Sequence, residues 1–546
     1  MTRTTTFALC LVTLTASGAA GGMAACSSSS SGNNGSSGSS SGGAEASTDA
    51  PAAMGLVPEI ACTDSIDSIY ADPGDVSSKP KGAILKCAKD RDMTAAQLLA
   101  ATQSQVDAGN VPYNGKNFTS GAHIYRVLYR TERGDANNSP GYSSALLLLP
   151  ETPRNGGKGL PVVVAAHGSN GLGPGCASSK NAMDEPETPT NAQYVQVDYY
   201  HLVYPLVGLG YAVIAPDNAG YANWGGANNP PPQYDGAADI GKSVLDGARA
   251  LRKLVPSSLS QQAVIVGHSE GGGSALMALA LASSYGLDGV LSGVAVYTPL
   301  WISKRSYAGL LSLPSQFPLS GSTAAVVSLM YHWSHSALLD GPDAGYELFQ
   351  QSKVPDLQNF FNNDCWAPSY PDLTKNGEKT DNDYFDPAYV QAVSGLNPVF
   401  GSGTCTGDGG ALQECQTWVD RMTADWPHLD GGAAQVPLLL WYANGDTTLP
   451  PDYMQCTLNR LAADGVSAKY CYDTTPNAID GVSQGHSASV AHNSDYVADW
   501  IAQLTLPDAG APSEPCQAIP TNDAGIAQLY DDEGGAVSCY KYIPNQ

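Results

Sequence analysis

The chain has 546 residues, and 42% of them are hydrophobic, which is enough to form a large buried core. Its 51 acidic residues outnumber the 26 basic residues and give a net charge of −25. This charge argues against nucleic acid and anionic membrane surfaces as electrostatic partners. No apolar stretch approaches the roughly 20 residues that a membrane-spanning helix needs.

The N-terminus carries a predicted targeting segment. Arg3 precedes the apolar run FALCLVTLTA, and small residues follow, so residues 1–25 are predicted to be a signal peptide. The small residues before Cys26 resemble a bacterial lipobox, in which the cysteine is lipidated and becomes the first residue of the mature chain. Residues 26–58 are rich in Ser and Gly and are predicted to be a flexible tether. We therefore expect an exported protein, either tethered to a membrane through a lipidated Cys26 or simply secreted.

Ten cysteines remain when Cys10 and Cys26 are set aside. An even number in an exported chain predicts up to five disulfides, although the sequence does not determine their connectivity. Close spacing favours the pairs Cys405–Cys415, Cys456–Cys471 and Cys516–Cys539. No CxxC pair and no Cys/His cluster has the spacing of a zinc site, so we expect neither a metal nor a cofactor.

From about Tyr113 the sequence alternates between predicted strands and predicted helices. Strands are predicted at 123–131, 143–150, 160–168, 210–217, 263–267 and 436–446, and helices at 239–254, 272–286 and 495–504. Runs such as LPVVVAAHG and GYAVIAPD are apolar without interruption, which is typical of strands buried on both faces. Buried strands that alternate with helices predict an α/β fold with a mostly parallel, doubly wound sheet.

Residues 300–430 interrupt this alternation with mixed helix signals and many loops, and they contain six of the eight Phe residues. We interpret this segment as a largely helical cap inserted between two strands, in which the Phe residues either contact substrate or pack the cap's own core.

The predicted organisation is a signal peptide at 1–25, a tether at 26–58, the first part of the sheet domain at 59–299, the cap at 300–430, the second part of the sheet domain at 431–505 and a Cys-containing extension at 506–546.

The stretch AVIVGHSEGGG places Ser269 between a predicted buried strand and a predicted helix. It fits the motif G-x-S-x-G, in which a serine hydroxyl is held out at a sharp strand-to-helix turn and glycines avoid backbone clashes. The helix that follows directs its positive N-terminal end toward a developing oxyanion. A Gly-rich turn without a function is the alternative, but the flanking strand and helix favour Ser269 as a nucleophile.

A serine nucleophile needs a base that takes its proton and an acid that orients the base. In enzymes with this motif the acid follows the serine along the chain, and the histidine follows the acid. Two histidines follow the last predicted strand: His486 precedes the closing helix, and His492 lies within it or at its start. We favour His486 as the base. Asp446, at the carboxyl end of its strand, is favoured as the acid; Asp452, or a purely turn-forming role for Asp446, remains the alternative.

An oxyanion needs two backbone N–H donors, and the first is expected from Glu270, directly after the serine. The second is expected from the loop HGSNG (167–171), which follows an earlier buried strand. Ser169 is favoured for this position and Asn170 is the alternative, while a loop without a catalytic role is the other interpretation. Asp217, at the end of GYAVIAPD, is interpreted as a structural turn residue.

Four features together resemble the α/β-hydrolase superfamily: HGSNG, GHSEGG, GDTTLPP, and His486 ahead of a helix that bears Trp500. AAHGSNGLGPGCASS, GYAVIAPDNAGYANWGG and SVLDGARALRKL further resemble the secretory lipase group, which is related to Candida lipase A. The resemblance covers about residues 110–505 and implies an α/β-hydrolase fold, hydrolysis of carboxylic esters and acyl chains held under the cap. The chain departs from the group in having CASS in place of CAPS and in its long terminal extensions, which leaves the acyl-chain preference open.

We therefore expect a serine ester hydrolase, either an esterase or a lipase, that acts on an ester or lipid small molecule through an acyl-enzyme. One alternative is a serine exopeptidase of the same fold, although Glu270 stands where such enzymes often carry an aromatic residue. The other alternative is a non-catalytic surface lipoprotein. We expect no nucleic-acid partner, and the sequence does not indicate an oligomeric state.

Overall fold

The computed structural model describes most of the chain between Gly55 and Leu529. The described residues are 55–104, 113, 115–180, 198–226, 229–301, 311, 319, 323–366, 370–397, 402–443, 445–446, 448–449, 451–473, 486–512, 516–522, 526–527 and 529. The predicted signal peptide, Cys26, nearly all of the predicted tether and the end of the predicted C-terminal extension therefore lie outside the described residues.

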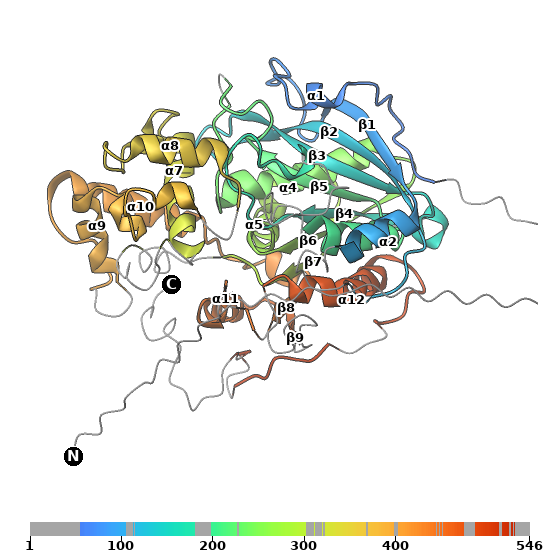
Figure 1. Ribbon diagram of the computed structural model, residues 1–546. Helices are drawn as coiled ribbons and strands as arrows, with labels where there is room; N and C mark the ends of the chain where they lie inside the picture. The colour runs from blue at the N-terminus through green and yellow to red at the C-terminus, as the bar shows by residue number, and fades with distance from the viewer. Residues whose placement is uncertain are drawn as a thin grey trace, which may run out of the picture. The chain divides into compact units, whose positions relative to one another are not determined.

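Within these ranges, nine strands form one sheet in the order β1-β2-β3-β5-β4-β6-β7-β8-β9 (Figure 1). The strands are β1 (Ile84–Met93), β2 (Ala122–Glu132), β3 (Pro140–Pro150), β4 (Leu160–Ala166), β5 (Val213–Ala219), β6 (Leu259–His268), β7 (Val290–Tyr297), β8 (Leu438–Ala443) and β9 (Ala468–Asp473). The strands from β5 to β9 pair in parallel, and β1, β2 and β3 add antiparallel pairs at one edge. This confirms the predicted α/β class with a mostly parallel sheet.

Helices cover both faces of the sheet, which confirms the doubly wound arrangement. Those that contact the sheet are α1 (Ile66–Ile69), α2 (Ala95–Ser104), α3 (Tyr204–Gly208), α4 (Ala237–Leu254), α5 (Glu270–Tyr285) and α12 (Ala488–Thr505), and α11 (Pro451–Ala463) links β8 to β9. The helices α4 and α5 pack together on one face, whereas α2, α3 and α12 pack together on the other. In α4, Ile240, Val244 and Leu251 recur at helical spacing and are fully buried, so the apolar stripe of this helix is its contact with the sheet.

The predicted cap lies between β7 and β8 along the chain, and Figure 1 draws it in yellow and orange. Its helices are α7 (Thr323–Leu339), α8 (Val354–Asn363), α9 (Pro387–Val393) and α10 (Gly409–Ala424). The four described Phe residues of the cap, Phe349, Phe360, Phe361 and Phe385, are each at most 2% exposed. They pack against other aromatic rings, as Phe361 does by stacking on Trp333 with ring centroids 4.3 Å apart. These four side chains therefore form the core of the cap; Phe317 and Phe400 lie outside the described residues.

Four disulfides join described residues: Cys62–Cys87, Cys176–Cys365, Cys405–Cys415 and Cys471–Cys516. The expected Cys405–Cys415 pair is confirmed. The expected pairs Cys456–Cys471 and Cys516–Cys539 are wrong, because Cys471, on the edge strand β9, is bonded to Cys516; Cys456 is also disulfide-bonded. Several disulfides in one chain are typical of exported proteins.

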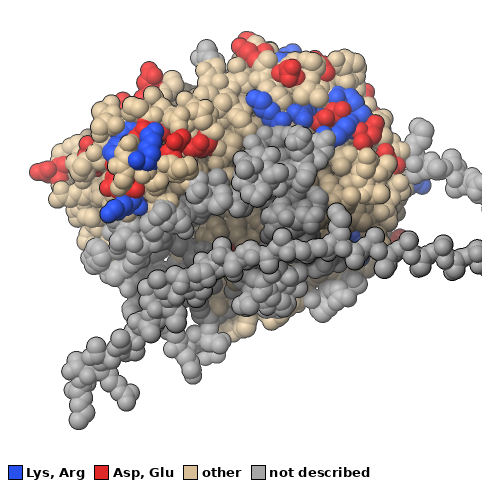
Figure 2. Space-filling model, in the orientation of Figure 1, with Lys and Arg blue, Asp and Glu red and all other residues tan. Residues whose placement is uncertain are grey.

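Basic and acidic side chains lie next to one another on the face of the molecule in Figure 2, both over the cap helices and over the β1–β2 edge. Two ion pairs of the cap illustrate this: Lys353 pairs with Glu378, and Lys375 with Asp356 at 2.8 Å. The coloured atoms of this face therefore offer no extended basic patch to a polyanion. Among the described residues, no helix has the length and hydropathy needed to cross a bilayer.

Candidate active site

Ser269 lies at the sharp turn between β6, in the middle of the sheet, and α5 (Figure 1). Its backbone has φ 55° and ψ −123°, a conformation that is strained for any residue other than glycine. Two backbone hydrogen bonds hold it there: the Ser269 N–H donates to the Tyr297 carbonyl at 3.0 Å, and the Leu300 N–H donates to the Ser269 carbonyl at 2.7 Å. The strand-to-helix turn predicted from G-x-S-x-G is therefore present.

The glycines around Ser269 are required by close backbone contacts. A Cβ atom on Gly267 would lie 2.1 Å from the Gly271 carbonyl oxygen, and one on Gly271 would lie 2.1 Å from the Ala166 carbonyl oxygen. A Cβ on Gly273 would lie 1.8 Å from the carbonyl oxygen of Leu300. These distances are far below van der Waals contact, and each glycine lets the first turn of α5 approach a neighbouring segment. The cluster of glycines is therefore part of the turn's construction and not a generic loop.

We expect Gly271→Ala to lower the free energy of unfolding by about 1–3 kcal/mol or more, because the added methyl group overlaps backbone of β4. The measurement is chemical unfolding followed by circular dichroism. Gly410→Ala is the matched control, because no atom lies within 4 Å of a Cβ at Gly410, in α10. Equal stability of the two variants would contradict the close approach of α5 to β4.

Asp446 and His486 form a hydrogen-bonded pair beyond the carboxyl end of β8. The His486 Nδ1–H donates to Asp446 Oδ2 at 2.7 Å, and the Asp446 side chain is almost completely buried. The other carboxylate oxygen, Oδ1, accepts hydrogen bonds of 2.9 Å from the N–H groups of Thr448 and Leu449. Burial alone would raise the pKa of the Asp446 carboxyl, but His486 and these donors outweigh it and hold that pKa below its usual value.

The other ring nitrogen of His486, Nε2, is buried and has no hydrogen-bond partner among the described residues. Because Nδ1 carries the proton that Asp446 accepts, Nε2 of the neutral ring has a free lone pair. His486 lies beside the turn: its ring is 4.7 Å from the ring of His268, the residue before Ser269, between centroids. No hydrogen bond joins the Ser269 hydroxyl to His486, which is common for such groups before substrate binds.

His492, the alternative base, forms its own pair with a carboxylate. It lies on α12, and its Nδ1–H donates to Asp473 Oδ2, at the end of β9, at 2.8 Å. Both side chains are buried. The ring contact with the residue before Ser269 is made by His486, and this contact favours His486 as the base. The alternative acid is Asp452, whose side chain is not among those that the structure describes.

The loop 167–171, which follows β4, lies against the turn. A Cβ atom on Gly168 would be 3.3 Å from the Cβ of Ser269. The Gly168 N–H is already bonded to the Asp198 carboxylate, whereas the N–H groups of Ser169 and Glu270 have no acceptor within the described part of the chain. Among the described residues, no acceptor competes with a ligand for these two N–H groups, and their role as oxyanion donors stays a prediction. The carbonyl of Asn170, the alternative, accepts a hydrogen bond from the Trp366 N–H of the cap at 3.1 Å.

The Glu270 side chain belongs to a buried polar cluster beside this loop. Its Oε1 accepts a hydrogen bond of 3.3 Å from the Asp235 N–H, and the hydroxyls of Ser169 and Tyr234 are 2.7 Å apart. Burial raises the pKa of Glu270 from 4.5 to about 7, and the nearby His167, the Asp235 N–H and the Ser169 hydroxyl only partly offset it. Glu270 therefore changes charge near neutral pH, one residue from Ser269.

This raised pKa predicts a pH-dependent stability. Because the folded protein holds the Glu270 proton more tightly than the unfolded chain, the free energy of unfolding should fall as pH rises from about 4.5 to about 7. The expected loss from this group is about 3 kcal/mol. The measurement is chemical unfolding of wild type and Glu270→Gln across this range, since the glutamine cannot ionise. A difference between the two proteins that does not change with pH would contradict the raised pKa.

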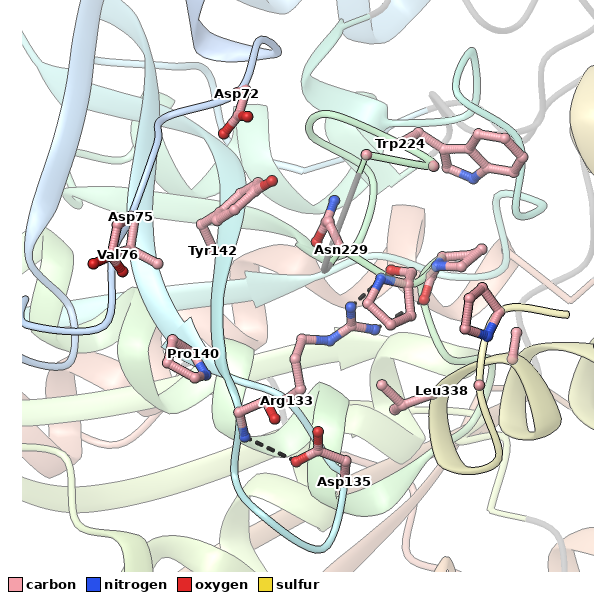
Figure 3. Close-up of a pocket in the computed structure, with 18 of the residues that line it drawn as sticks. Asp72, Asp75, Val76, Arg133, Asp135, Pro140, Tyr142, Trp224, Asn229 and Leu338 are labelled. Atoms are coloured by element: carbon pink, nitrogen blue, oxygen red, sulfur yellow. Dashed lines mark hydrogen bonds between the residues drawn. The ribbon is translucent and has the colours of Figure 1, made fainter. Parts of the chain in front are cut away.

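A cavity of about 940 Å³ opens elsewhere on the molecule and stands apart from this site (Figure 3). Its walls include Tyr142, Trp224 and Trp333, and none of Ser269, Asp446 and His486 lines it. Arg133 reaches into its wall, but the guanidinium donates to the carbonyls of Pro230 and Pro231 and pairs with Asp239 at 2.8 Å. The positive charge is therefore already neutralised and does not make the cavity an anion site.

Sequence reasoning identified the residues of the turn and of the His–Asp pair but missed two buried partners, Asp198 and His268. His268 stands inside the motif itself, and its side chain contacts both Asp198 and His486. The only indication in the sequence of a role for His268 was its position as a titratable residue directly before the proposed nucleophile. Within the described residues, no group of three or more His, Cys, Asp or Glu side chains is arranged to hold a metal ion.

Comparison with known proteins supports the predicted resemblance. The model of the secretory lipase family matches residues 185–300, a segment that contains β5, α4, β6, Ser269 and α5. No curated protein matches the chain significantly. The chain thus resembles the secretory lipase family over the part that carries the strand-to-helix turn.

Solved structures share the fold at low sequence identity. A rice cell wall degrading esterase, LipA from Xanthomonas oryzae, is 15% identical with a TM-score of 0.54, covering 79% of this chain and 100% of that one. Lipase A from Candida antarctica in its closed state is 15% identical with a TM-score of 0.51, covering 87% and 92%. A putative hydrolase from Legionella pneumophila is 16% identical with a TM-score of 0.53, covering 78% and 99%. The α/β-hydrolase fold expected from the sequence is confirmed.

Proposed function

We propose that this chain, which has the α/β-hydrolase fold and resembles the secretory lipase family, is a serine carboxylic ester hydrolase. One observation carries the proposal. The imidazole of His486, which is fixed by a buried carboxylate through Nδ1 and has no partner at Nε2 among the described residues, lies beside a serine that is held in a strained strand-to-helix turn. This arrangement supplies a base and a nucleophile in the order along the chain that the fold uses.

In the proposed mechanism, the Ser269 hydroxyl attacks the ester carbonyl and passes its proton to His486 Nε2. The Asp446 carboxylate keeps the other proton on Nδ1 and stabilises the imidazolium that forms. The negative charge that develops on the carbonyl oxygen accepts hydrogen bonds from the N–H groups of Ser169 and Glu270, each of which contributes about 10²–10³-fold to the rate.

The tetrahedral intermediate then collapses. The C–O bond to the alcohol breaks, the alcohol leaves with the proton from His486, and the acyl group stays on Ser269 as an ester. Water attacks this acyl-enzyme by the same route: His486 removes a proton from the water, and Ser269 recovers its hydroxyl as the acid departs. Every proton in this sequence moves through the Nε2 atom that is unpartnered in the structure.

The substrate class we propose is a small-molecule or lipid ester with its acyl chain under the cap. The structural neighbours include an esterase and a lipase, which supports ester hydrolysis. The disulfides and the resemblance to the secretory lipase family support export; for the location we propose a lipid anchor on Cys26, with simple secretion as the alternative. Partitioning of wild type and Cys26→Ser into a detergent phase distinguishes the two.

The test is a series of p-nitrophenyl esters of increasing acyl length, together with labelling by a fluorophosphonate probe. We expect hydrolysis of at least one ester and covalent labelling at Ser269. Cleavage of aminoacyl-p-nitroanilides but of no ester would overturn the proposal in favour of an exopeptidase. A wild-type protein that is inert toward both the substrates and the probe would favour a non-catalytic lipoprotein.

A further inference from the structure

A further histidine–carboxylate pair, formed by His268 and Asp198, lies next to Ser269 and has no role in the proposed mechanism. His268 is the last residue of β6, and Asp198 immediately precedes the π-helical turn Tyr199–Val203. The distance from His268 Nδ1 to Asp198 Oδ1 is 2.8 Å. The two residues are only 4% and 7% exposed. A buried ion pair is costly to desolvate, so its presence beside a reactive serine calls for a physical reason.

The hydrogen bonds of His268 determine its charge. Nδ1 faces the Asp198 carboxylate, and Nε2 faces the backbone carbonyl of His486 at 3.2 Å. A carboxylate and a carbonyl can only accept, so both ring nitrogens must donate, and only the imidazolium carries two N–H groups. Asp198 is held as the anion, because its second oxygen accepts the Gly168 N–H.

The electrostatics of the surroundings agree with this assignment. Burial alone would lower the pKa of His268, but the Asp198 charge and the hydrogen bonds to Asp198 and His486 raise it above its usual value. Asp446 adds a smaller stabilisation of the cation. For Asp198, burial acts to raise the pKa, but His268 and the Gly168 N–H hold it below its usual value, and His167 contributes in the same direction.

Through these contacts one ion pair joins three separate segments of the chain. Asp198 holds the loop 167–171 through the Gly168 N–H, next to the proposed donor Ser169. His268 is covalently bonded to Ser269 and also holds the carbonyl of His486. These segments come from the ends of β4 and β6 and from the start of α12. The pair therefore links the segments that carry the nucleophile, one proposed oxyanion donor and the base.

We propose that the Asp198–His268 ion pair is a positioning device that holds the backbone of His486 and the loop 167–171 in register with Ser269. The inference rests on the proposed function, because it assigns these three segments their catalytic parts. Asp198 and His268 form hydrogen bonds with each other and with backbone groups, so they act through the residues that carry out the proposed reaction. A displacement of about 1 Å in such a site can cost about 10²-fold in rate.

The cap supplies a matched control. His335 is buried, its Nε2 lies 2.7 Å from Asp425 Oδ2, and its Nδ1 lies 2.7 Å from the Tyr331 carbonyl. It repeats the arrangement of His268, a carboxylate on one nitrogen and a carbonyl on the other, but it is on α7, and neither Asp425 nor Tyr331 belongs to the proposed site. Replacing either histidine by glutamine removes the same kind of buried pair.

The experiment compares His268→Gln, Asp198→Asn and His335→Gln, by kcat and KM on the best p-nitrophenyl ester and by chemical unfolding. We expect kcat to fall about 10- to 100-fold in His268→Gln and Asp198→Asn with KM nearly unchanged, and kcat to stay near the wild-type value in His335→Gln. A kcat of His268→Gln equal to that of His335→Gln, in folded proteins, would overturn the inference.

A measurement on the wild type keeps the inference testable if a variant fails to fold. With ¹⁵N-labelled histidine, NMR across a pH range should show that His268 keeps protons on both ring nitrogens to a higher pH than a free imidazole, whereas loss of one of them at or below that pH would overturn the proposed pair. The two proposals fail in different ways. A wild type without ester hydrolysis contradicts the proposed function, and an active wild type with an unaffected His268→Gln contradicts the positioning device alone.

Discussion

Ser269→Ala is expected to lower kcat for a short p-nitrophenyl ester by about 10⁶-fold, because the hydroxyl that forms the acyl-enzyme is removed. The residual rate would come from the oxyanion donors and from substrate binding, which the substitution leaves in place. Folding should be unaffected: alanine tolerates the positive φ no worse than serine does, and the backbone hydrogen bonds to Tyr297 and Leu300 remain. The measurements are initial rates, probe labelling and chemical unfolding.

The matched control for this variant is Ser274→Ala, on the next turn of the same helix. Ser274 is buried, and its hydroxyl donates to the Glu270 carbonyl at 2.8 Å, so its loss perturbs α5 without removing a reacting group. We expect Ser274→Ala to retain most of the activity. Activity that survives in Ser269→Ala would place the nucleophile elsewhere.

Asp446→Asn is expected to lower kcat by about 10⁴-fold. The carboxylate accepts the proton on His486 Nδ1 and thereby leaves the lone pair on Nε2, the nitrogen that acts as the base in the proposed mechanism. An asparagine amide that donates to Nδ1 would favour the opposite tautomer, with the proton on Nε2, so the ring could no longer act as a base. The measurement is kcat across a pH range, since raising the pH does not restore a lone pair to Nε2 in the unfavourable tautomer.

Asp473→Asn tests the same chemistry at the neighbouring pair. Asp473 accepts a hydrogen bond from His492 just as Asp446 does from His486, and both carboxylates follow parallel strands. We expect Asp473→Asn to keep a kcat near that of the wild type. A large loss in Asp473→Asn beside a small loss in Asp446→Asn would reassign the base to His492 and the acid to Asp473.

The parts of the fold that could be predicted from sequence are those whose environment is uniform along the element. β4, β5, β8 and residues 263–268 of β6 are buried on both faces, and their sequences contain apolar runs. The expectations included no strand at β1, β7 or β9. Both β1 and β9 are edge strands of mixed polarity, ILKCAKDRDM and AKYCYD, and the Ser–Gly pair within β7 interrupts its apolar pattern.

The same reasoning explains which parts of the site could be predicted. Ser269 and Asp446 are constrained by their places at strand ends, His486 by its place before the closing helix, and all three by their order along the chain; sequence shows these constraints. The Asp198–His268 pair depends on how a segment before α3 folds over the end of β6, and no local pattern encodes this contact. The Cys471–Cys516 disulfide is similar, because it depends on β9 forming the edge of the sheet.

The Cys176–Cys365 disulfide and the hydrogen bond from Trp366 to Asn170 attach the end of α8 to the segment after β4. The cap is therefore not a module that can be exchanged independently of the sheet domain. A chimera with the cap of a relative would also need the segment after β4 that the cap contacts, with a cysteine placed to form the disulfide. Without them, the transplanted cap would displace the loop 167–171. Substrate range in this scaffold should accordingly be redesigned by point substitutions inside the cap and not by transplanting it whole.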